Sequence, residues 1–138
     1  MNRLFVYGTL RKGSAHPMQV RLAAHAEHLG AVCIAGDLYD LGPYPGLFVP
    51  ASQGGSVRGD LYELNAAMAV AFWEELDRYE GCSASQPEPH QYRRAKAEVV
   101  LDSGERMLAF VYVLRDRPAG AALVLSGDWN FRGGAASE

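Results

Sequence analysis

Glu80 is the residue whose type and position most clearly predict chemistry. Counted at about 100° per residue along the helix expected over residues 66–80, it falls on the same stripe as Phe72 and Leu76, which must face the core. Burial disfavours a charged carboxylate, and the carbonyl end of a helix adds negative potential, so both effects raise the pKa. A glutamate in that position is suited to general base and general acid work near neutral pH. The alternative is that the helix ends before Glu80 and the carboxylate lies in water, because glutamate is rarely buried.

A second candidate lies at the start of the chain, where residues 5–14 read FVYGTLRKGS. Gly8 and Gly13 have the spacing of a phosphate-binding loop, G-x-x-x-x-G. That loop requires Lys and then Ser or Thr directly after its second glycine. Here Ser14 follows Gly13 directly and Lys12 precedes it. A nucleotide site is therefore not favoured, and the segment calls for another explanation.

Two further patterns have simpler explanations. Cys82 and His90 would make a nucleophile and its base if they touched, but nothing in the sequence brings them together. His25 and His28 lie three residues apart in an expected helix and could in principle hold a metal. Without acids or thiols near them they are expected to be surface histidines. We therefore expect no metal site.

The elements that must position Glu80 and the first turn follow from the hydrophobic pattern and the turn residues. Strands are expected at residues 3–7, 31–38, 57–64, 92–101 and 106–114, and helices at residues 17–29 and 66–80. Gly30 and Gly81 are the expected ends of the two helices, and Asn65 is the expected N-cap of the second. Turns are expected at residues 41–46 and 102–105. Strands outnumber helices and are irregularly spaced, which predicts an α+β fold with a small, strongly curved sheet or mixed β-barrel.

Length and composition narrow the class of protein. The 138 residues are expected to form one domain, residues 1–138, with a flexible tail from about residue 130. The net charge of −3 gives no footprint for nucleic acid or an anionic membrane surface, and no apolar run approaches the ~18 residues of a membrane span. Cys33 and Cys82 make no disulfide framework, so free thiols in the cytoplasm are expected. The oligomeric state cannot be read from the sequence.

Six short motifs occur in order between residue 3 and Leu114. They are FVYGTLRKG, PYPGL, VRGDLYEL, LDRYEGC, YRR and AFVYVL. Together they resemble the gamma-glutamylcyclotransferase-like superfamily, and most of all its gamma-glutamylamine cyclotransferase branch and small bacterial relatives. The pair VYGTL and LDRYEG, about 70 residues apart, is the most specific part. The resemblance implies a small mixed β-barrel with helices packed around it.

The resemblance also implies an activity on γ-glutamyl amines or amides. The α-amine of such a substrate attacks its own γ-carbonyl, releasing 5-oxoproline and a free amine, without a metal or cofactor. The family's catalytic acid/base matches Glu80. The segment that matches Tyr7, Gly8, Thr9 and Leu10 lines the pocket and holds the γ-glutamyl group through main-chain groups. Gly8 would then let backbone N–H groups approach the ligand closely and stabilise negative charge.

Three more residues are candidate walls of this substrate-binding pocket. Tyr92 and Arg94 lie two apart in an expected strand, so they share a face. Arg94 either pairs with the substrate α-carboxylate or is a solvated cation. Tyr112 is either a core aromatic or a pocket wall. Residues 44–46 either rim the pocket or form a plain tight turn.

Two departures from the family pattern leave the substrate open. The loop at residues 82–91 is long and holds two prolines, so it could change which amine is accepted. The region after Leu114 matches poorly apart from SGDW at residues 126–129. The alternatives are a non-catalytic small-ligand-binding or regulatory domain, and a related enzyme that removes a γ-glutamyl group from a biosynthetic intermediate. Glu80 favours the enzyme, because a pure binder gains little from an acid on an apolar face.

Overall fold

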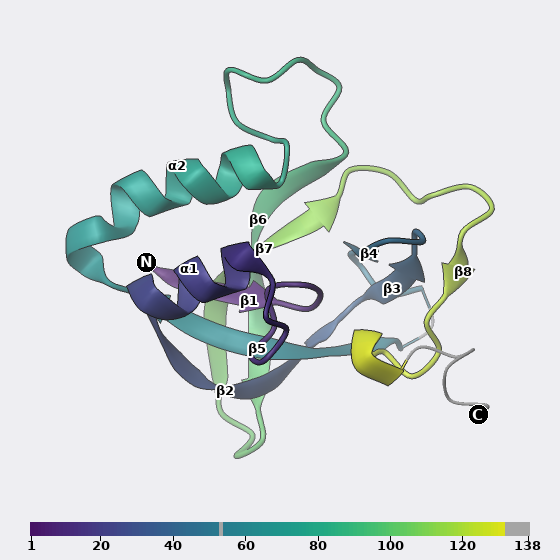
Figure 1. The fold of residues 1–138 in the computed structure, drawn as a ribbon. Helices are drawn as coiled ribbons and strands as arrows, with labels where there is room; N and C mark the ends of the chain where they lie inside the picture. The colour runs from purple at the N-terminus through teal and green to yellow at the C-terminus, as the bar shows by residue number, and fades with distance from the viewer. Residues whose placement is uncertain (53, 132–138) are drawn as a thin grey trace.

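The computed structural model describes residues 1–52 and 54–131 (Figure 1). In chain order the elements are β1 (Arg3–Val6), α1 (Pro17–His25), β2 (Ala26–Ala35), β3 (Asp37–Asp40), β4 (Pro45–Phe48), β5 (Ser56–Leu64), the 3-10 turn η1 (Ala66–Met68), α2 (Ala69–Tyr79), β6 (Tyr92–Leu101), β7 (Arg106–Leu114), β8 (Ala122–Leu123) and the 3-10 turn η2 (Trp129–Phe131). Residues 132–138, most of the tail expected to be flexible, lie outside the described residues.

Five strands form a closed barrel in the order β1-β5-β2-β6-β7. Neighbours pair antiparallel along this order, and the barrel closes where β1 and β7 pair in parallel at Leu4 and Phe110. A second sheet of order β4-β3-β8 flanks it. Figure 1 shows α1 and α2 over one side of the barrel and the small sheet at the other. The predicted α+β fold with a small mixed barrel is confirmed.

The first helix is shorter than the sequence pattern predicts. We expected residues 17–29, but α1 ends at His25 and the chain turns directly into β2. β2 pairs with β5 from Ala26 to Ala35, and the pairing shifts between His28 and Gly30, where Gly30 has φ +139°. Gly30 therefore serves a bulge in a strand and does not end a helix. Long-range pairing with β5 overrides the local helical pattern here.

The second helix follows its sequence signals closely. Asn65 accepts a hydrogen bond from the N–H of Ala67 at 3.0 Å and so starts η1, which leads into α2. Phe72 and Leu76 lie on its buried face. Glu80 is the C-cap residue, and Gly81 follows with φ +78°, the left-handed conformation that commonly ends a helix.

The buried side chains form two clusters on either side of the barrel wall. One lies between the barrel and the two helices and includes Leu22, Phe72 and Leu76. The other fills the barrel interior towards the small sheet and includes Trp129 from the C-terminal segment. The residues after Leu114, in which the sequence shows little regular pattern, are thus packed into the fold. Among the described residues, no helix combines the length and apolar character that crossing a membrane would take.

Candidate active site

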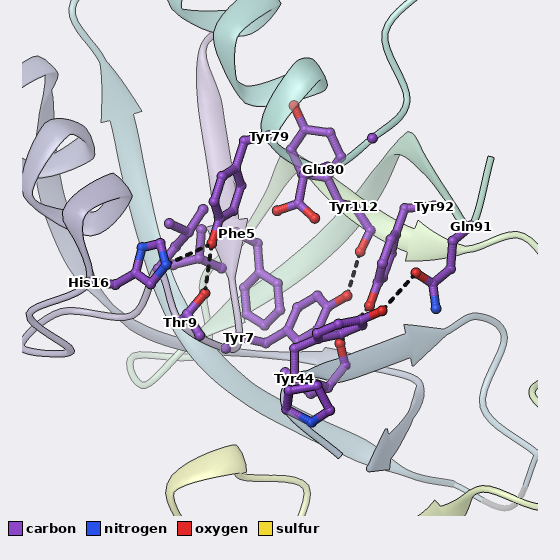
Figure 2. Close-up of a pocket in the computed structure, with 16 residues that line it drawn as sticks. Phe5, Tyr7, Thr9, His16, Tyr44, Tyr79, Glu80, Gln91, Tyr92 and Tyr112 are labelled. Atoms are coloured by element: carbon purple, nitrogen blue, oxygen red, sulfur yellow. Dashed lines mark hydrogen bonds between the residues drawn. The ribbon is translucent and has the colours of Figure 1, made fainter. Parts of the chain in front are cut away.

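A cavity of about 500 Å³ opens between the end of α2 and the start of the chain (Figure 2). Its walls come from β1 and the turn that follows it, the β3–β4 connection, the end of α2, and strands β6 and β7. Seven of the eight predicted site residues line it: Tyr7, Gly8, Thr9, Leu10, Glu80, Tyr92 and Tyr112. The fold therefore brings together residues that lie up to about 100 positions apart in the sequence.

The carboxyl group of Glu80 points into the cavity (Figure 2). The N–H of Glu80 still donates to the carbonyl of Leu76 at 2.9 Å, so the last helical turn is formed and fixes the direction of the side chain. Within the described chain the carboxylate makes no hydrogen bond or ion pair. Burial, and then the negative charge of Asp77, raise the pKa of Glu80 to about 7. The alternative of a frayed helix end with Glu80 in bulk water does not hold.

The turn after β1 forms the opposite wall. Its N–H groups at Gly8, Thr9 and Leu10 donate to no acceptor within the described residues, and all three residues line the cavity. A Cβ atom on Gly8 would lie 2.8 Å from Cγ of Pro45, too close for any other residue without a shift. The group that approaches Gly8 closely in the structure is thus the Pro45 side chain, and the two cavity walls lie in contact at this point.

The three predicted tyrosines make rigid, uncharged walls. Tyr7 donates a hydrogen bond to the carbonyl of Tyr112 at 2.7 Å and accepts one from the N–H of Leu47 at 3.2 Å. Tyr92 donates to the carbonyl of Pro45 at 2.8 Å. Burial is the main cause that raises the pKa of Tyr7 and of Tyr92, and the nearby Glu80 raises each pKa further. Both therefore stay protonated near neutral pH.

Arg94 is the one predicted binding residue that the structure does not bring to this cavity. It shares the expected strand face with Tyr92, but its guanidinium pairs with both oxygens of Asp77 at 3.0 and 3.2 Å. It also lies over the rings of Trp73 and Phe110, with Cζ 4.6 and 4.8 Å from their centroids. The carboxylate that Arg94 binds thus belongs to α2, and the cation is already satisfied.

Two residues that sequence reasoning missed, His16 and Tyr79, line the mouth of the cavity. Nδ1 of His16 accepts from the N–H of Met18 at 3.0 Å as the N-cap of α1, so the ring proton of neutral His16 lies on Nε2. Nε2 lies 3.4 Å from the hydroxyl of Tyr79, which lies 3.2 Å from Oγ1 of Thr9. The position of His16 directly before a helix-starting proline was the signal available.

Tyr44 does rim the cavity, as one reading of residues 44–46 predicts. Its hydroxyl donates to Oε1 of Gln91 at 3.1 Å, and both side chains lie at the cavity edge (Figure 2). Gln91 ends the long loop at residues 82–91, so this loop borders the cavity at that point.

The other candidate chemistries find no support. Burial raises the pKa of Cys82 to about 11, with Asp77 next in effect, which keeps the thiol protonated and unreactive. His90 and Cys82 line a second hollow without a mutual hydrogen bond. His25 and His28 lie on different elements and bond to a carbonyl and to Asp60, respectively. In the part of the chain that the structure describes, no three His, Cys, Asp or Glu residues are grouped as metal ligands.

The barrel and this cavity define a small α+β protein with an acid and a turn of unbonded amides in the walls of a pocket of small-molecule size. A family model described as "Gamma-glutamyl cyclotransferase, AIG2-like" matches residues 4–131, and the chain belongs to that family. The family resemblance read from the six motifs is thereby confirmed.

Individual relatives agree with this family membership. A protein of Vibrio cholerae named "Putative gamma-glutamylcyclotransferase" is 32% identical over 128 residues, covering 91% of this chain and 93% of the relative. A solved structure of an uncharacterized protein from Pyrococcus horikoshii is 26% identical with a TM-score of 0.63, covering 94% of this chain and 91% of that one. An AIG2-like protein of Mus musculus is 22% identical with a TM-score of 0.70, covering 99% of this chain and 92% of that one. The mouse structure supports the fold.

Proposed function

We propose that this protein is a cyclotransferase that acts on γ-glutamyl amines or amides. The substrate α-amine attacks the γ-carbonyl carbon, a C–N bond closes the five-membered ring, and the original amide C–N bond breaks. The products are 5-oxoproline and a free amine. The observation that carries the proposal is the position of the Glu80 carboxyl group, which has a pKa near 7 and lines the same cavity as residues 8–10, whose amides donate to no acceptor among the described residues.

Glu80 has the role of proton carrier in this scheme. Its carboxylate takes a proton from the α-ammonium, which frees the amine for attack, and later gives a proton to the departing nitrogen. An acid with a pKa close to the working pH serves both steps well, and such proton transfer contributes about 10²–10⁴-fold in rate. The lack of any competing hydrogen bond to Glu80 within the described residues leaves its oxygens available to the substrate.

The turn amides have the role of holding negative charge. Of the described residues, those that line the cavity include no Lys or Arg, so the donors for the anionic oxygens of the substrate are backbone N–H groups together with side chains such as Thr9 and Gln91. Amides aimed at an oxyanion in a cavity with little water are effective, because they need no rearrangement during the reaction. The tyrosine walls fold the substrate so that amine and carbonyl meet, an effect worth about 7–11 kcal/mol in well-oriented systems.

The test is to incubate the protein with γ-glutamyl-ε-lysine and a panel of other γ-glutamyl amines and amides and to measure 5-oxoproline. Glu80→Gln keeps the shape of the side chain and is expected to lose about 10²-fold or more of the rate. Glu74→Gln, on the exposed face of the same helix, is the matched control and is expected to keep it.

Three other results would redirect the assignment. Equal rates for the wild type and Glu80→Gln would remove Glu80 from the mechanism. No product from any member of the panel would favour a ligand-binding or regulatory domain. Product only from a large γ-glutamylated intermediate would favour an enzyme that removes a protecting γ-glutamyl group.

A further inference from the structure

Of the two cations in the first turn, Arg11 and Lys12, the Arg11 side chain is engaged by the protein itself. Arg11 donates from Nε to Oδ2 of Asp60 at 3.2 Å and from Nη1 to Oδ1 of Asp128 at 2.7 Å. The three side chains are only 12%, 8% and 14% exposed, so this ion pair is shielded from water. We call Arg11, Asp60 and Asp128 the Arg11 clamp. It joins the first turn to β5 and to the C-terminal segment.

Asp60 is the fixed end of the clamp. It lies in the middle of β5, opposite Val6 on β1 and Ala31 on β2, so the barrel ladder holds its backbone. Its Oδ2 also accepts the backbone N–H of Lys12 at 3.1 Å, and its Oδ1 lies 3.1 Å from Nε2 of His28. The carboxylate therefore binds both the side chain of Arg11 and the backbone one residue further along.

Asp128 is fixed as well, although it lies in a segment with little regular structure. The carbonyl of Gly127 accepts from the N–H of Arg58 on β5 at 2.7 Å. A Cβ atom on Gly127 would lie 1.9 Å from the carbonyl oxygen of Ser56, so only glycine lets this segment lie so close to the strand. The SGDW motif at residues 126–129 is thus the part of the C-terminal region that is seated on β5.

The amides of Gly8, Thr9 and Leu10 need a contact such as the Arg11 clamp to fix their position, because their own N–H groups make no hydrogen bond within the described residues. A backbone N–H that is to bind a ligand cannot also be fixed by a hydrogen bond of its own. Within the described chain the turn is closed by the N–H of Arg11 on the carbonyl of Gly8 at 3.0 Å and by bonds from Ser14 further on. Arg11 directly follows Leu10, so the clamp fixes the end of the amide segment.

We propose that Arg11 and Asp128 are positioning residues for the reaction: the Arg11 clamp holds the Gly8–Leu10 amides in the arrangement that binds substrate oxygen. The inference rests on the proposed function. It gives the C-terminal segment a role in activity, since Asp128 reaches no substrate and acts through Arg11. A misplacement of about 1 Å at such a group lowers the rate by about 10²-fold in well-studied enzymes.

The test compares Arg11→Lys and Asp128→Asn with a variant of another ion pair, in which the acid is equally buried and the arginine is more exposed. Lysine keeps the charge but cannot reach two carboxylates from a planar fork, and asparagine keeps the shape of Asp128 without its charge. Arg117→Lys is the control, because Arg117 donates to the equally buried Asp37 at 2.7 Å away from the cavity. We expect kcat/KM to fall about 10-fold to 100-fold in Arg11→Lys, less in Asp128→Asn, and less than about twofold in Arg117→Lys.

A second readout follows the amides directly and does not depend on turnover. In ¹⁵N NMR spectra the signals of Gly8, Thr9 and Leu10 are expected to shift in Arg11→Lys and to stay unchanged in Arg117→Lys. Asp128→Asn decides the matter if Arg11→Lys does not fold.

The outcomes separate the two proposals. If the wild-type protein forms no 5-oxoproline, the proposed function is wrong, and the NMR spectra still test whether the Arg11 clamp positions the amides. Unchanged amide signals in Arg11→Lys overturn the inference, as does a rate loss in Arg117→Lys equal to that in Arg11→Lys, which would mark a general loss of stability.

Discussion

Asp77 lies one helical turn before Glu80, and its charge adds to burial in raising the pKa of Glu80 to about 7. The carboxylate of Asp77 is held in place, because Arg94 binds both of its oxygens and the hydroxyl of Tyr112 donates to Oδ1 at 2.6 Å. Arg94, outside the cavity, and Tyr112, in the cavity wall, thus fix a negative charge one helical turn from the proposed proton carrier. The pKa of Glu80 is a property of this arrangement, and it can be tested in two ways.

The first prediction concerns stability against pH. The folded state holds the proton on Glu80 up to a pKa of about 7, whereas the unfolded state releases it near the ordinary value of 4.5. Between these values the folded state binds more protons, so this group's contribution to stability is complete below about pH 4.5 and is lost as the pH rises to about 7. The loss amounts to about 3 kcal/mol of unfolding free energy.

Denaturant unfolding of the wild type and Glu80→Gln at about pH 5 and about pH 8 measures this loss of unfolding free energy. The difference between the two proteins isolates Glu80 from the other carboxylates, some of which are stabilised as the pH rises. Glu80→Gln should become the more stable of the two towards pH 8. A difference that does not change with pH would mean that Glu80 has an ordinary pKa.

The second prediction concerns the acidic limb of the pH–rate profile. The reaction needs the Glu80 carboxylate to accept a proton, so kcat/KM is expected to rise with pH and level off above a pKa of about 7. Asp77→Asn removes the charge that raises this pKa and leaves Arg94 unpaired, and both changes lower it. The limb should therefore move to lower pH. Glu74→Gln, exposed on the same helix, should leave it in place, and an unmoved limb in Asp77→Asn would exclude Asp77 as a cause.

Glu80 was predictable from the sequence because its signals are local. The cap at Asn65, the helix end at Gly81 and the stripe of Phe72 and Leu76 all lie within a short segment. The structure has the last two as expected, whereas Asn65 caps η1, the 3-10 turn that leads into α2. The place of the early turn in the cavity was predictable for a different reason, since only the resemblance of its motif to the family indicated it. The barrel itself followed from the number and irregular spacing of the strands.

The errors lie where a distant partner decides the structure. Residues 26–29 continue a helical pattern but pair with β5, more than thirty positions further on, and become a strand. The sequence correctly placed Arg94 on the same strand face as Tyr92. The carboxylate that pairs with Arg94 is that of Asp77, however, and it lies on a different element, α2. The Arg11 clamp was invisible for the same reason, because its two acids come from β5 and from the end of the chain.

The third prediction concerns the contact between Gly8 and Pro45. A methyl group added in Gly8→Ala would lie 2.8 Å from Cγ of Pro45, so the two cavity walls must move apart. Overpacking of this kind costs about 1–3 kcal/mol, and we expect a higher KM together with a lower melting temperature. Pro45→Ala removes the opposing atoms and leaves the main-chain carbonyl that binds Tyr92. The double variant should recover part of both losses, whereas additive losses would show that the contact is not the cause.

The last prediction distinguishes between two roles of Arg94: the pairing with Asp77 seen in the structure, and the substrate binding predicted from the sequence. Arg94→Gln breaks the two-point pair with Asp77 and the stacking on Trp73 and Phe110, so the free energy of unfolding should fall by about 1–3 kcal/mol for this partly exposed pair. If Arg94 bound the substrate α-carboxylate, KM would rise about 30-fold or more, since one partner of a charge pair would be lost.

The geometry instead predicts that KM changes less than about threefold, because the guanidinium is occupied and lies outside the cavity. Arg93→Gln, its exposed neighbour on the strand, controls for a general loss of positive charge. Thermal unfolding and steady-state kinetics on the same preparations measure both effects. A large rise in KM confined to Arg94→Gln would mean that Arg94 leaves Asp77 to meet the substrate, and the fixed charge beneath Glu80 would then change during the reaction.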